Sequence, residues 1–119
     1  MAVPAPVRRA LRRLERYCPL DRPARLYLLR QWPGYWGQAW AKRGERHIEA
    51  YLCPPAWSDV TVDTVFHEWA HAMCWSLTRV DHGEVWGSAY SRCYRVVVEG
   101  WQPAKAWRPK TSRAAARRR

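Results

Sequence analysis

Apolar residues recur at helical spacing along the middle of the chain. They follow a period close to 3.6 residues; they are Val62, Val65, Phe66, Trp69, Ala70, Met73 and Leu77. Ser58 and Asp59 stand at the start of this pattern and offer a capping hydroxyl and a carboxylate at the positive end of a helix dipole. No Pro or Gly interrupts residues 58–82. The pattern therefore predicts an amphipathic helix that begins near residue 58.

Two further segments show an amphipathic pattern. Residues 78–81 can turn the chain, and His82-Gly83 opens a second helical stretch, with apolar positions at Val85, Trp86, Ala89, Tyr90, Cys93 and Val97. Near the start of the chain, residues 5–17 place Val7, Leu11 and Leu14 on one face and arginines around the rest. Such a basic helix can bind a membrane or nucleic acid. Docking of its apolar face on the domain core is the favoured interpretation.

Three strand-like segments lie between the first two helical patterns. They cover residues 25–31, 35–42 and 47–53, with turn signals at Pro33-Gly34 and Arg43-Gly44. The order of elements predicts an α+β domain in which a small antiparallel three-stranded sheet packs on the central helix. Trp32, Trp36 and Trp40 are spaced by four, but the Pro and Gly residues among them favour strand alternation after a turn. Packing is the favoured role of this trio, and stacking on bases is the alternative.

Length and charge define the organisation around these elements. A chain of 119 residues is long enough for one modest core, which we place in residues 1–107. Residues 1–43 hold ten basic and two acidic residues, residues 44–100 hold four and eight, and residues 101–119 hold seven and none. Both ends are therefore strongly basic, whereas the central segment is mildly acidic.

The last segment, residues 108–119, has the composition of a disordered basic tail. Its cationic residues are candidates for phosphate contacts through counterion release; they are Arg108, Lys110, Arg113, Arg117, Arg118 and Arg119. The alternative is a tail that only aids solubility, or the composition habit of an Arg-rich genome. Contact with DNA through the basic ends is the partner that this pattern favours.

The central helix carries the candidate chemistry. Residues 67–71 read His-Glu-Trp-Ala-His, and positions i and i+4 share one helix face, so His67 and His71 can offer imidazole nitrogens to one ion. Glu68 is turned by about 100° around the helix. It therefore lies beside the ion, where a carboxylate can take a proton from an attacking water. The pattern predicts a Zn²⁺ site with Glu68 as the catalytic base.

His82, at the head of the next helical stretch, is the candidate third ligand. Glu84 and Glu99 are the alternatives, since a carboxylate can complete such a site. Cys74 follows His71 by three and could approach the metal as a fourth protein ligand, whereas a catalytic site keeps that position for water. Asp81 is a candidate partner for a ligand imidazole, and His47, the fourth histidine, is interpreted as a surface or strand residue.

These motifs resemble the SprT-like zinc metallopeptidases, which include the Spartan proteases. The resemblance rests on HEWAHAMCW and RVDHGEVWGSAY: Ala72 matches the small residue after the second His, and His82-Gly83 with Trp86 matches the second block. It is specific over residues 62–95, weaker over 25–61 and absent at both ends. The paired Cys-x-x-Cys of the zinc ribbon found in many members is missing. The resemblance implies a minimal zincin-like domain, action inside cells, and cleavage of proteins attached to DNA.

The sequence thus favours a zinc-dependent endopeptidase that acts on nucleic-acid-associated proteins, and we expect a monomer. A nucleic-acid-binding or interaction module with structural zinc and no peptidase activity is the alternative. A third hypothesis is a viral or mobile-element protein that binds a host factor through a Trp-rich surface; the compact size and basic ends fit a phage origin. The four widely spaced cysteines, Cys18, Cys53, Cys74 and Cys93, read as reduced thiols. With no apolar leader and no apolar run long enough to cross a bilayer, a cytoplasmic location is expected.

Overall fold

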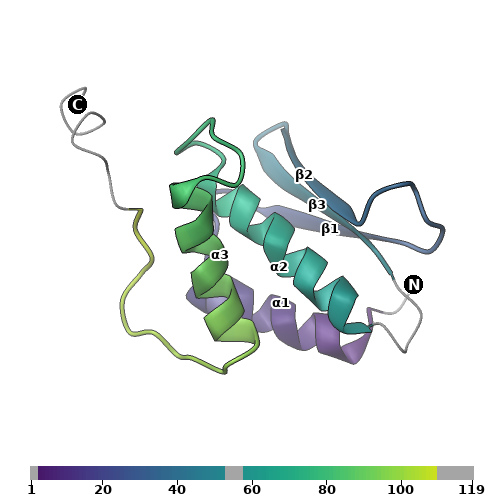
Figure 1. The fold of residues 1–119 in the computed structure, drawn as a ribbon, viewed down its shortest axis with the longest axis horizontal. Coiled ribbons are helices and arrows are strands. Elements are labelled where there is room, and N and C mark those ends of the chain that lie inside the picture. Colours follow the sequence, from purple (N-terminus) through teal and green to yellow (C-terminus); the bar gives the residue numbers. More distant parts are fainter. Residues whose placement is uncertain (1–2, 53–57, 110–119) are drawn as a thin grey trace.

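In the part of the chain that the structure describes, three helices and three strands form one α+β unit (Figure 1). The computed structural model describes residues 3–52 and 58–109. In chain order the elements are α1 (Ala5–Tyr17), β1 (Ala24–Leu29), β2 (Gly37–Lys42), β3 (Glu45–Tyr51), α2 (Ser58–Cys74) and α3 (Glu84–Val97). The helix expected over residues 5–17 is confirmed, and each expected strand is present with bounds shifted by at most two residues. Cys53, the expected end of the third strand, lies outside the described residues.

The sheet is mixed, so the expectation of an antiparallel sheet is wrong. Its strand order is β1-β3-β2, with β3 antiparallel to β2 and parallel to β1. The β2–β3 hairpin closes at Arg43 and Gly44, whose φ angles of 55° and 75° fit the two positive φ values of a type I′ turn. The long connection from β1 to β2 leaves room between them for one more strand, and β3 fills it. Turn signals identify the hairpin, but they do not say which neighbour the first strand takes.

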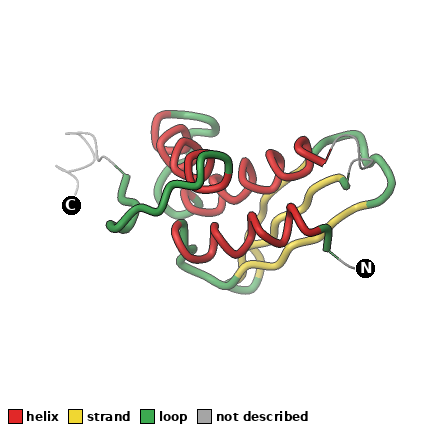
Figure 2. The backbone as a smooth tube through the Cα atoms, turned by 90° about the horizontal axis from the view of Figure 1, so that it is seen from below, coloured by secondary structure: helices red, strands yellow, loops and turns green. Residues whose placement is uncertain are grey.

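Helix α2 is the centre of the fold, with the sheet on one side and α1 and α3 on its other faces (Figures 1 and 2). Its buried side chains include Val65, Phe66, Trp69 and Ala70, the positions that the helical period selects. The indole Nε1 of Trp69 donates a hydrogen bond of 2.7 Å to the Cys18 carbonyl after α1. From α1, the buried Val7 and Leu14 join this core, which confirms that the first helix docks through its apolar face.

Alternation along the strands sorts side chains between the two faces of the sheet. Ile48 and Ala50 of β3 are buried in the core. On the opposite face the His47 ring is nearly parallel to the rings of Trp40 and Tyr27, with centroids 5.2 and 5.7 Å away. His47 is therefore a strand residue as expected, but it is buried, so the surface interpretation is wrong. The neighbouring rings cover it.

The tryptophan trio divides between two environments. Trp40 lies on β2, whereas Trp32 and Trp36 stand in the loop between β1 and β2. In that loop the rings of Trp32 and Trp36 meet edge to face at 4.7 Å, and the Trp32 ring is 5.2 Å from that of Tyr51. All three tryptophans thus take part in aromatic packing, although Trp32 and Trp36 stay exposed.

The segment after α3 runs back along that helix (Figure 1). The guanidinium of Arg92 donates to the carbonyls of Tyr17 and Lys105 at 2.9 and 2.7 Å. The indole of Trp107 donates to the Ser88 hydroxyl at 3.0 Å, near the N-terminal end of α3. These contacts hold the segment after α3 against the core as far as residue 107. In the part of the chain that the structure describes, no helix is both long enough and apolar enough to span a bilayer.

Candidate metal centre

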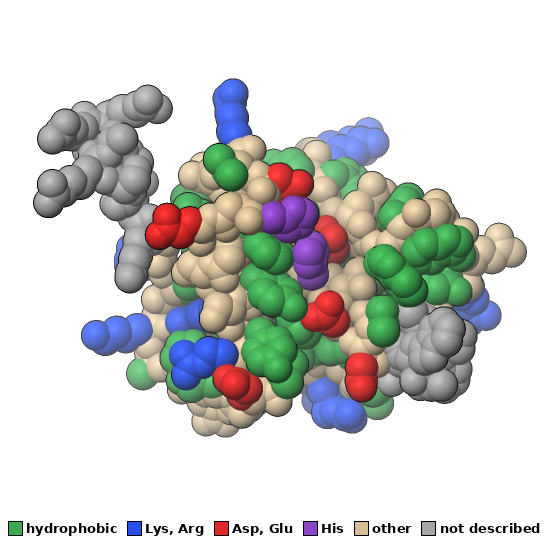
Figure 3. All heavy atoms as spheres, viewed as in Figure 1, with side chains coloured by type: hydrophobic (Ala, Val, Ile, Leu, Met, Phe, Trp, Pro, Cys, Tyr) green, Lys and Arg blue, Asp and Glu red, His purple; other side chains and the backbone are tan. Residues whose placement is uncertain are grey.

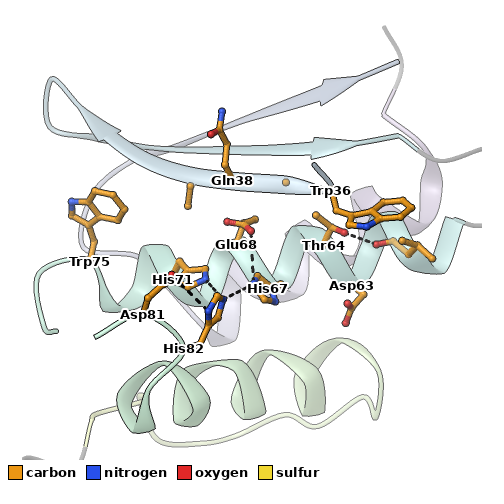
Figure 4. A pocket seen from close by; sticks show the side chains of 13 residues that line it. Trp36, Gln38, Asp63, Thr64, His67, Glu68, His71, Trp75, Asp81 and His82 are labelled. Carbon is orange, nitrogen blue, oxygen red and sulfur yellow. Dashed lines mark hydrogen bonds and ion pairs between the residues drawn. The ribbon is translucent and has the colours of Figure 1, made fainter. Parts of the chain in front are cut away.

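Three imidazole nitrogens meet at the junction of α2 and the turn before α3. His67 and His71 project from one face of α2, and His82 reaches them from the turn (Figure 4). The Nε2 atom of His82 lies 3.1 Å from Nε2 of His67 and 3.0 Å from Nε2 of His71. The structure therefore brings together the three histidines selected from the sequence, close enough to hold one metal ion.

The arrangement suits a cation better than a hydrogen-bond network. The Nε2 atom of His82 faces two other ring nitrogens, and a neutral imidazole nitrogen can donate or accept, but one proton cannot serve both neighbours. Three nitrogens bound to one tetrahedral zinc at about 2.0–2.1 Å lie about 3.3 Å from one another. The observed separations are near that value, so the donor set fits a tetrahedral ion.

Burial keeps the two helical imidazoles in the form that binds metal. Burial lowers the pKa of His71 to about 4. It also lowers the pKa of His67, and the charge of nearby His82 lowers that pKa further. A lowered pKa leaves the ring neutral at physiological pH, and a neutral ring has a free lone pair. Both helical histidines are therefore available as ligands without first losing a proton.

Asp81 and Trp86 surround the three imidazoles from the outside. The Asp81 carboxylate lies 3.4 Å from Nδ1 of His71 and 3.7 Å from Nδ1 of His82. A carboxylate at Nδ1 favours the tautomer whose Nε2 carries the lone pair. The Trp86 ring contacts all three imidazoles, with centroids 4.8, 5.2 and 4.7 Å from those of His67, His71 and His82. Asp81 thus orients two rings, and Trp86 supports all three.

The turn that presents His82 has a tight local geometry. His82 adopts a φ of 54°, a left-handed conformation that a non-glycine residue takes at a cost of about 1–3 kcal/mol. Gly83 follows it, and a Cβ atom there would lie 2.6 Å from Cγ1 of Val80. The hydroxyl of Thr78 accepts a hydrogen bond of 3.0 Å from the Val80 amide. Close packing inside the turn explains the glycine after the third histidine.

Glu68 lies beside the three nitrogens, on the side that faces the sheet. Its side chain is almost fully buried, at 7% exposed, and Oε1 lies 3.9 Å from Nε2 of His67. Burial, with a smaller effect of the Asp81 charge, raises its pKa to about 7. A carboxyl group with a pKa near the working pH can accept a proton and give it back.

The three histidines open into a groove between α2 and β2 (Figure 4), with a volume of about 680 Å³. Its lining from β2 and the preceding loop includes Trp36, Gly37 and Gln38. Gly37 lets the strand approach the helix, because a Cβ atom there would lie 2.5 Å from Cγ2 of Thr64 and 2.7 Å from the Glu49 carbonyl oxygen. Glycine at this position therefore maintains the close contact between strand and helix at the groove.

The groove is acidic although the whole chain is strongly basic. Asp63, Glu68 and Asp81 line it, and no Lys or Arg does so among the described residues. Acidic side chains surround the histidines on this face, and Lys and Arg side chains lie toward its edges (Figure 3). The groove is thus unsuited to a polyanion, in contrast to the basic ends of the chain.

The alternative ligands lie apart from the three nitrogens. Cys74 points to the Val85 carbonyl, 3.6 Å away, and burial raises the pKa of its thiol to about 11. Glu99 pairs with Arg95 at the far end of α3, at 3.5 Å. Neither these residues nor Glu84 belongs to the ligand cluster found in the described part of the chain.

Of the polar side chains Tyr90, Arg92 and Tyr94 on α3, Tyr90 lies beside the histidines. Its ring centroid is 5.9 Å from that of His67, and its hydroxyl donates to Asp63 at 2.9 Å. Arg92 is buried and binds the two carbonyls described above. Tyr94 packs near Phe66, 6.2 Å between ring centroids. Arg92 and Tyr94 therefore have other roles.

Two groups of residues differ between the predicted site and the structure: the basic tail and part of the groove lining. Of the basic tail, Arg108 is exposed, and the remaining candidates from Lys110 to Arg119 lie outside the described residues. Trp36, Gly37 and Trp75 of the groove were not singled out as site residues, because they are distant in sequence from the histidines. Gly37 is a glycine inside an expected strand, which is the one sequence signal that can indicate a close approach of backbone.

Comparison of the chain with protein-family models, with curated proteins and with solved structures gave no match. The functional assignment therefore depends on the geometry of this site.

Proposed function

We propose that the protein is a zinc-dependent endopeptidase with a minimal zincin-like domain similar to the SprT-like metallopeptidases. The observation that carries this proposal is the convergence of the three histidines beside a buried carboxylate, with Nε2 of His82 3.1 Å from that of His67 and 3.0 Å from that of His71. The site faces an open groove. Enzymatic zinc sites combine three protein ligands with access for water and substrate.

His67, His71 and His82 would hold the ion. Bound zinc would supply a Lewis acid that polarises a peptide carbonyl and acidifies a water molecule. Glu68, 3.9 Å from the His67 nitrogen, takes the proton from the attacking water and gives it to the leaving amine. Asp81 and Trp86 hold the imidazoles in place while this happens.

An extended peptide fits the groove. β2 is an edge strand, and its residues Gly37, Gln38 and Ala39 line the groove beside the histidines. A substrate can add main-chain hydrogen bonds to such an edge. The acidic lining favours a peptide over a nucleic acid inside the groove, whereas the basic ends of the chain favour DNA elsewhere on the molecule. Proteins associated with nucleic acid are therefore the proposed substrates.

The competing function is an interaction module with a structural zinc and no peptidase activity. Structural zinc sites are closed by a fourth protein ligand. Cys74, the candidate for that position, is directed toward the Val85 carbonyl and its thiol has a raised pKa. This observation favours the enzyme over the module.

Metal analysis joined to a protease assay tests the proposal. We expect about one zinc per chain, with His67→Ala, His71→Ala and His82→Ala each far below that. We expect zinc-dependent cleavage of an unfolded protein such as casein, measured with and without DNA. Glu68→Gln should retain zinc and fold but lose at least the ~10²-fold typical of acid–base catalysis. Full zinc content without cleavage would support the structural module instead.

A further inference from the structure

Two exposed tryptophans stand at opposite ends of the groove, with the histidines and Glu68 between them (Figure 4). Trp36 precedes β2, and Trp75 follows α2. They are 47% and 43% exposed. Large aromatic side chains left open to solvent at the lining of a cleft are typical of binding surfaces.

The two ends of the groove are fixed by contacts between β2, β3 and α2. At one end, Gly37 lies against Thr64 and Glu68 of α2. At the other end, Arg46 of β3, which pairs with Ala41 of β2, donates to the Ser76 hydroxyl at 3.3 Å. Strand β2 and helix α2 therefore run in the same direction along the groove, from Trp36 toward Trp75.

The spacing of the tryptophans matches a short extended peptide. From Thr64 to Glu68 the helix rises about 6 Å, and from Glu68 to Cys74, the residue before Trp75, it rises about 9 Å. An extended chain advances about 3.3 Å per residue. An extended peptide thus needs about five residues to reach from Trp36 to Trp75. Glu68 would lie about two of these residues from Trp36 and about three from Trp75.

Trp36 is held in place before any substrate binds. Its ring meets the Trp32 ring edge to face at 4.7 Å and lies 6.1 Å from the Tyr51 ring. A ring supported in this way loses little freedom on binding, so more of its contact energy contributes to affinity. Trp36 should therefore contribute more than Trp75, which stands in the turn after α2.

We infer that Trp36 and Trp75 are specificity-determining residues, which select a peptide with large apolar or aromatic side chains on both sides of the bond that is cut. The inference rests on the proposed peptidase function for the reaction, but the binding preference can be measured without cleavage. Each tryptophan contacts the substrate side chain and takes no part in proton transfer.

Peptide binding to zinc-loaded Glu68→Gln protein tests the inference. The probes are fluorescently labelled peptides of Ser, Ala and Gly that carry one Phe, two adjacent Phe, or two Phe about five positions apart, and the readout is fluorescence anisotropy. We expect the widely spaced pair to bind about 2- to 10-fold more tightly than either single-Phe peptide. Trp36→Ala in this background should remove the gain from one Phe, Trp75→Ala should remove the gain from the other, and Trp36→Phe should restore most of the loss at that end.

Leu77→Ala is the matched control. Leu77 is 46% exposed, two residues beyond Trp75, and does not line the groove, so its removal should leave the preference unchanged. If both tryptophan variants bind every peptide as the parent does, or if the parent binds none of them, the inference is wrong. If the parent binds with the expected preference but wild-type protein with zinc cuts neither these peptides nor casein, the peptidase proposal fails and the binding preference stands.

Discussion

Asp81 contacts two imidazoles at once, so a single exposed residue acts on two of the three candidate ligands. Its two carboxylate oxygens lie 3.4 Å from His71 Nδ1 and 3.7 Å from His82 Nδ1. One of these rings belongs to a helix and the other to a turn. The carboxylate therefore joins the rigid part of the centre to its less regular part.

Replacing Asp81 tests this connection. Asp81→Asn should weaken zinc binding by about 10-fold, at the lower end of what loss of a ligand's outer partner costs, because this carboxylate is exposed to water. Competition with a chromophoric chelator measures the affinity. Glu99→Gln, which removes a carboxylate paired with Arg95 at the other end of α3, is the control and should leave the affinity unchanged. Equal affinities for both variants would show that Asp81 does not act on the ligands.

Glu68 should make the metal-free protein sensitive to pH. Its pKa rises from an ordinary 4.5 to about 7, mainly through burial, so its contribution to stability is complete below pH 4.5 and is lost as the pH rises to about 7. Glu68→Gln has no charge to bury. Without metal, this variant should therefore be more stable than wild type at pH 8, by on the order of 3 kcal/mol, and the two should be alike at pH 4. Thermal unfolding followed by circular dichroism across this range measures the difference, and equal stabilities at pH 8 would contradict the burial argument.

The helices were predictable from the sequence because each carries a local signal. The apolar period fixes α1 and the buried face of α2, and the two histidines of α2 follow from positions i and i+4. The pairing of β1 with β3 was not predictable, because a parallel neighbour depends on contacts between distant segments. For the same reason the groove could not be predicted, because Trp36 and Trp75 line it from segments that are far apart in the sequence. His82 could be selected as a candidate, but the turn that presents it could not.

The turn before α3 makes a specific steric demand. Gly83 has a φ of −83°, which any residue can adopt, so the obstacle to a side chain is Val80, whose Cγ1 would lie 2.6 Å from an added Cβ. Gly83→Ala should therefore displace His82 and lower zinc occupancy. The double variant Gly83→Ala with Val80→Ala should recover much of it, since the clashing methyl is gone. Metal content after dialysis against a weak chelator measures the recovery.

Gly37 differs from Gly83, because a backbone atom as well as a side chain leaves no room for a Cβ atom there. A Cβ atom there would also meet the Glu49 carbonyl oxygen at 2.7 Å, and no side-chain substitution removes a backbone atom. Gly37→Ala should destabilise the protein even when Thr64→Ser removes the nearer methyl. A full recovery in that double variant would mean that the strand can move away from β3, contrary to the packing described above.

For the whole molecule, the distribution of charge separates two surfaces with different partners. The groove carries carboxylates, while the chain as a whole has a net charge of +11. Contacts such as that of Trp107 with Ser88 bring the last described residues toward the N-terminal end of α3, the end that follows His82. The basic tail thus starts at the end of α3 nearest the candidate centre.

Removal of residues 108–119 tests the role of this tail. Six of the seven basic residues after residue 100 would be lost, so DNA binding should weaken for every sequence tested. The slope of log affinity against log salt should decrease by about 0.9 for each phosphate contact removed. Zinc content and thermal unfolding should stay unchanged, because Trp107 is the last of the described hydrophobic residues that packs against the core. The arginines of α1 should retain part of the affinity, and DNA binding that does not respond to the truncation or to salt would contradict the nucleic-acid role.

The closeness of the candidate ligands along the chain has a consequence for the order of folding. His82 follows His67 by 15 positions and His71 by 11, and closing so short a loop costs little entropy. All three candidate ligands have thus been synthesised and released once α2 and the following turn have left the ribosome exit tunnel, and none waits for a distant strand. An ion captured at that moment would clamp α2 and the start of α3 as a helical hairpin, onto which α1 and the sheet can then assemble. Metal supply during synthesis, as well as afterwards, would then influence how fast the native protein accumulates.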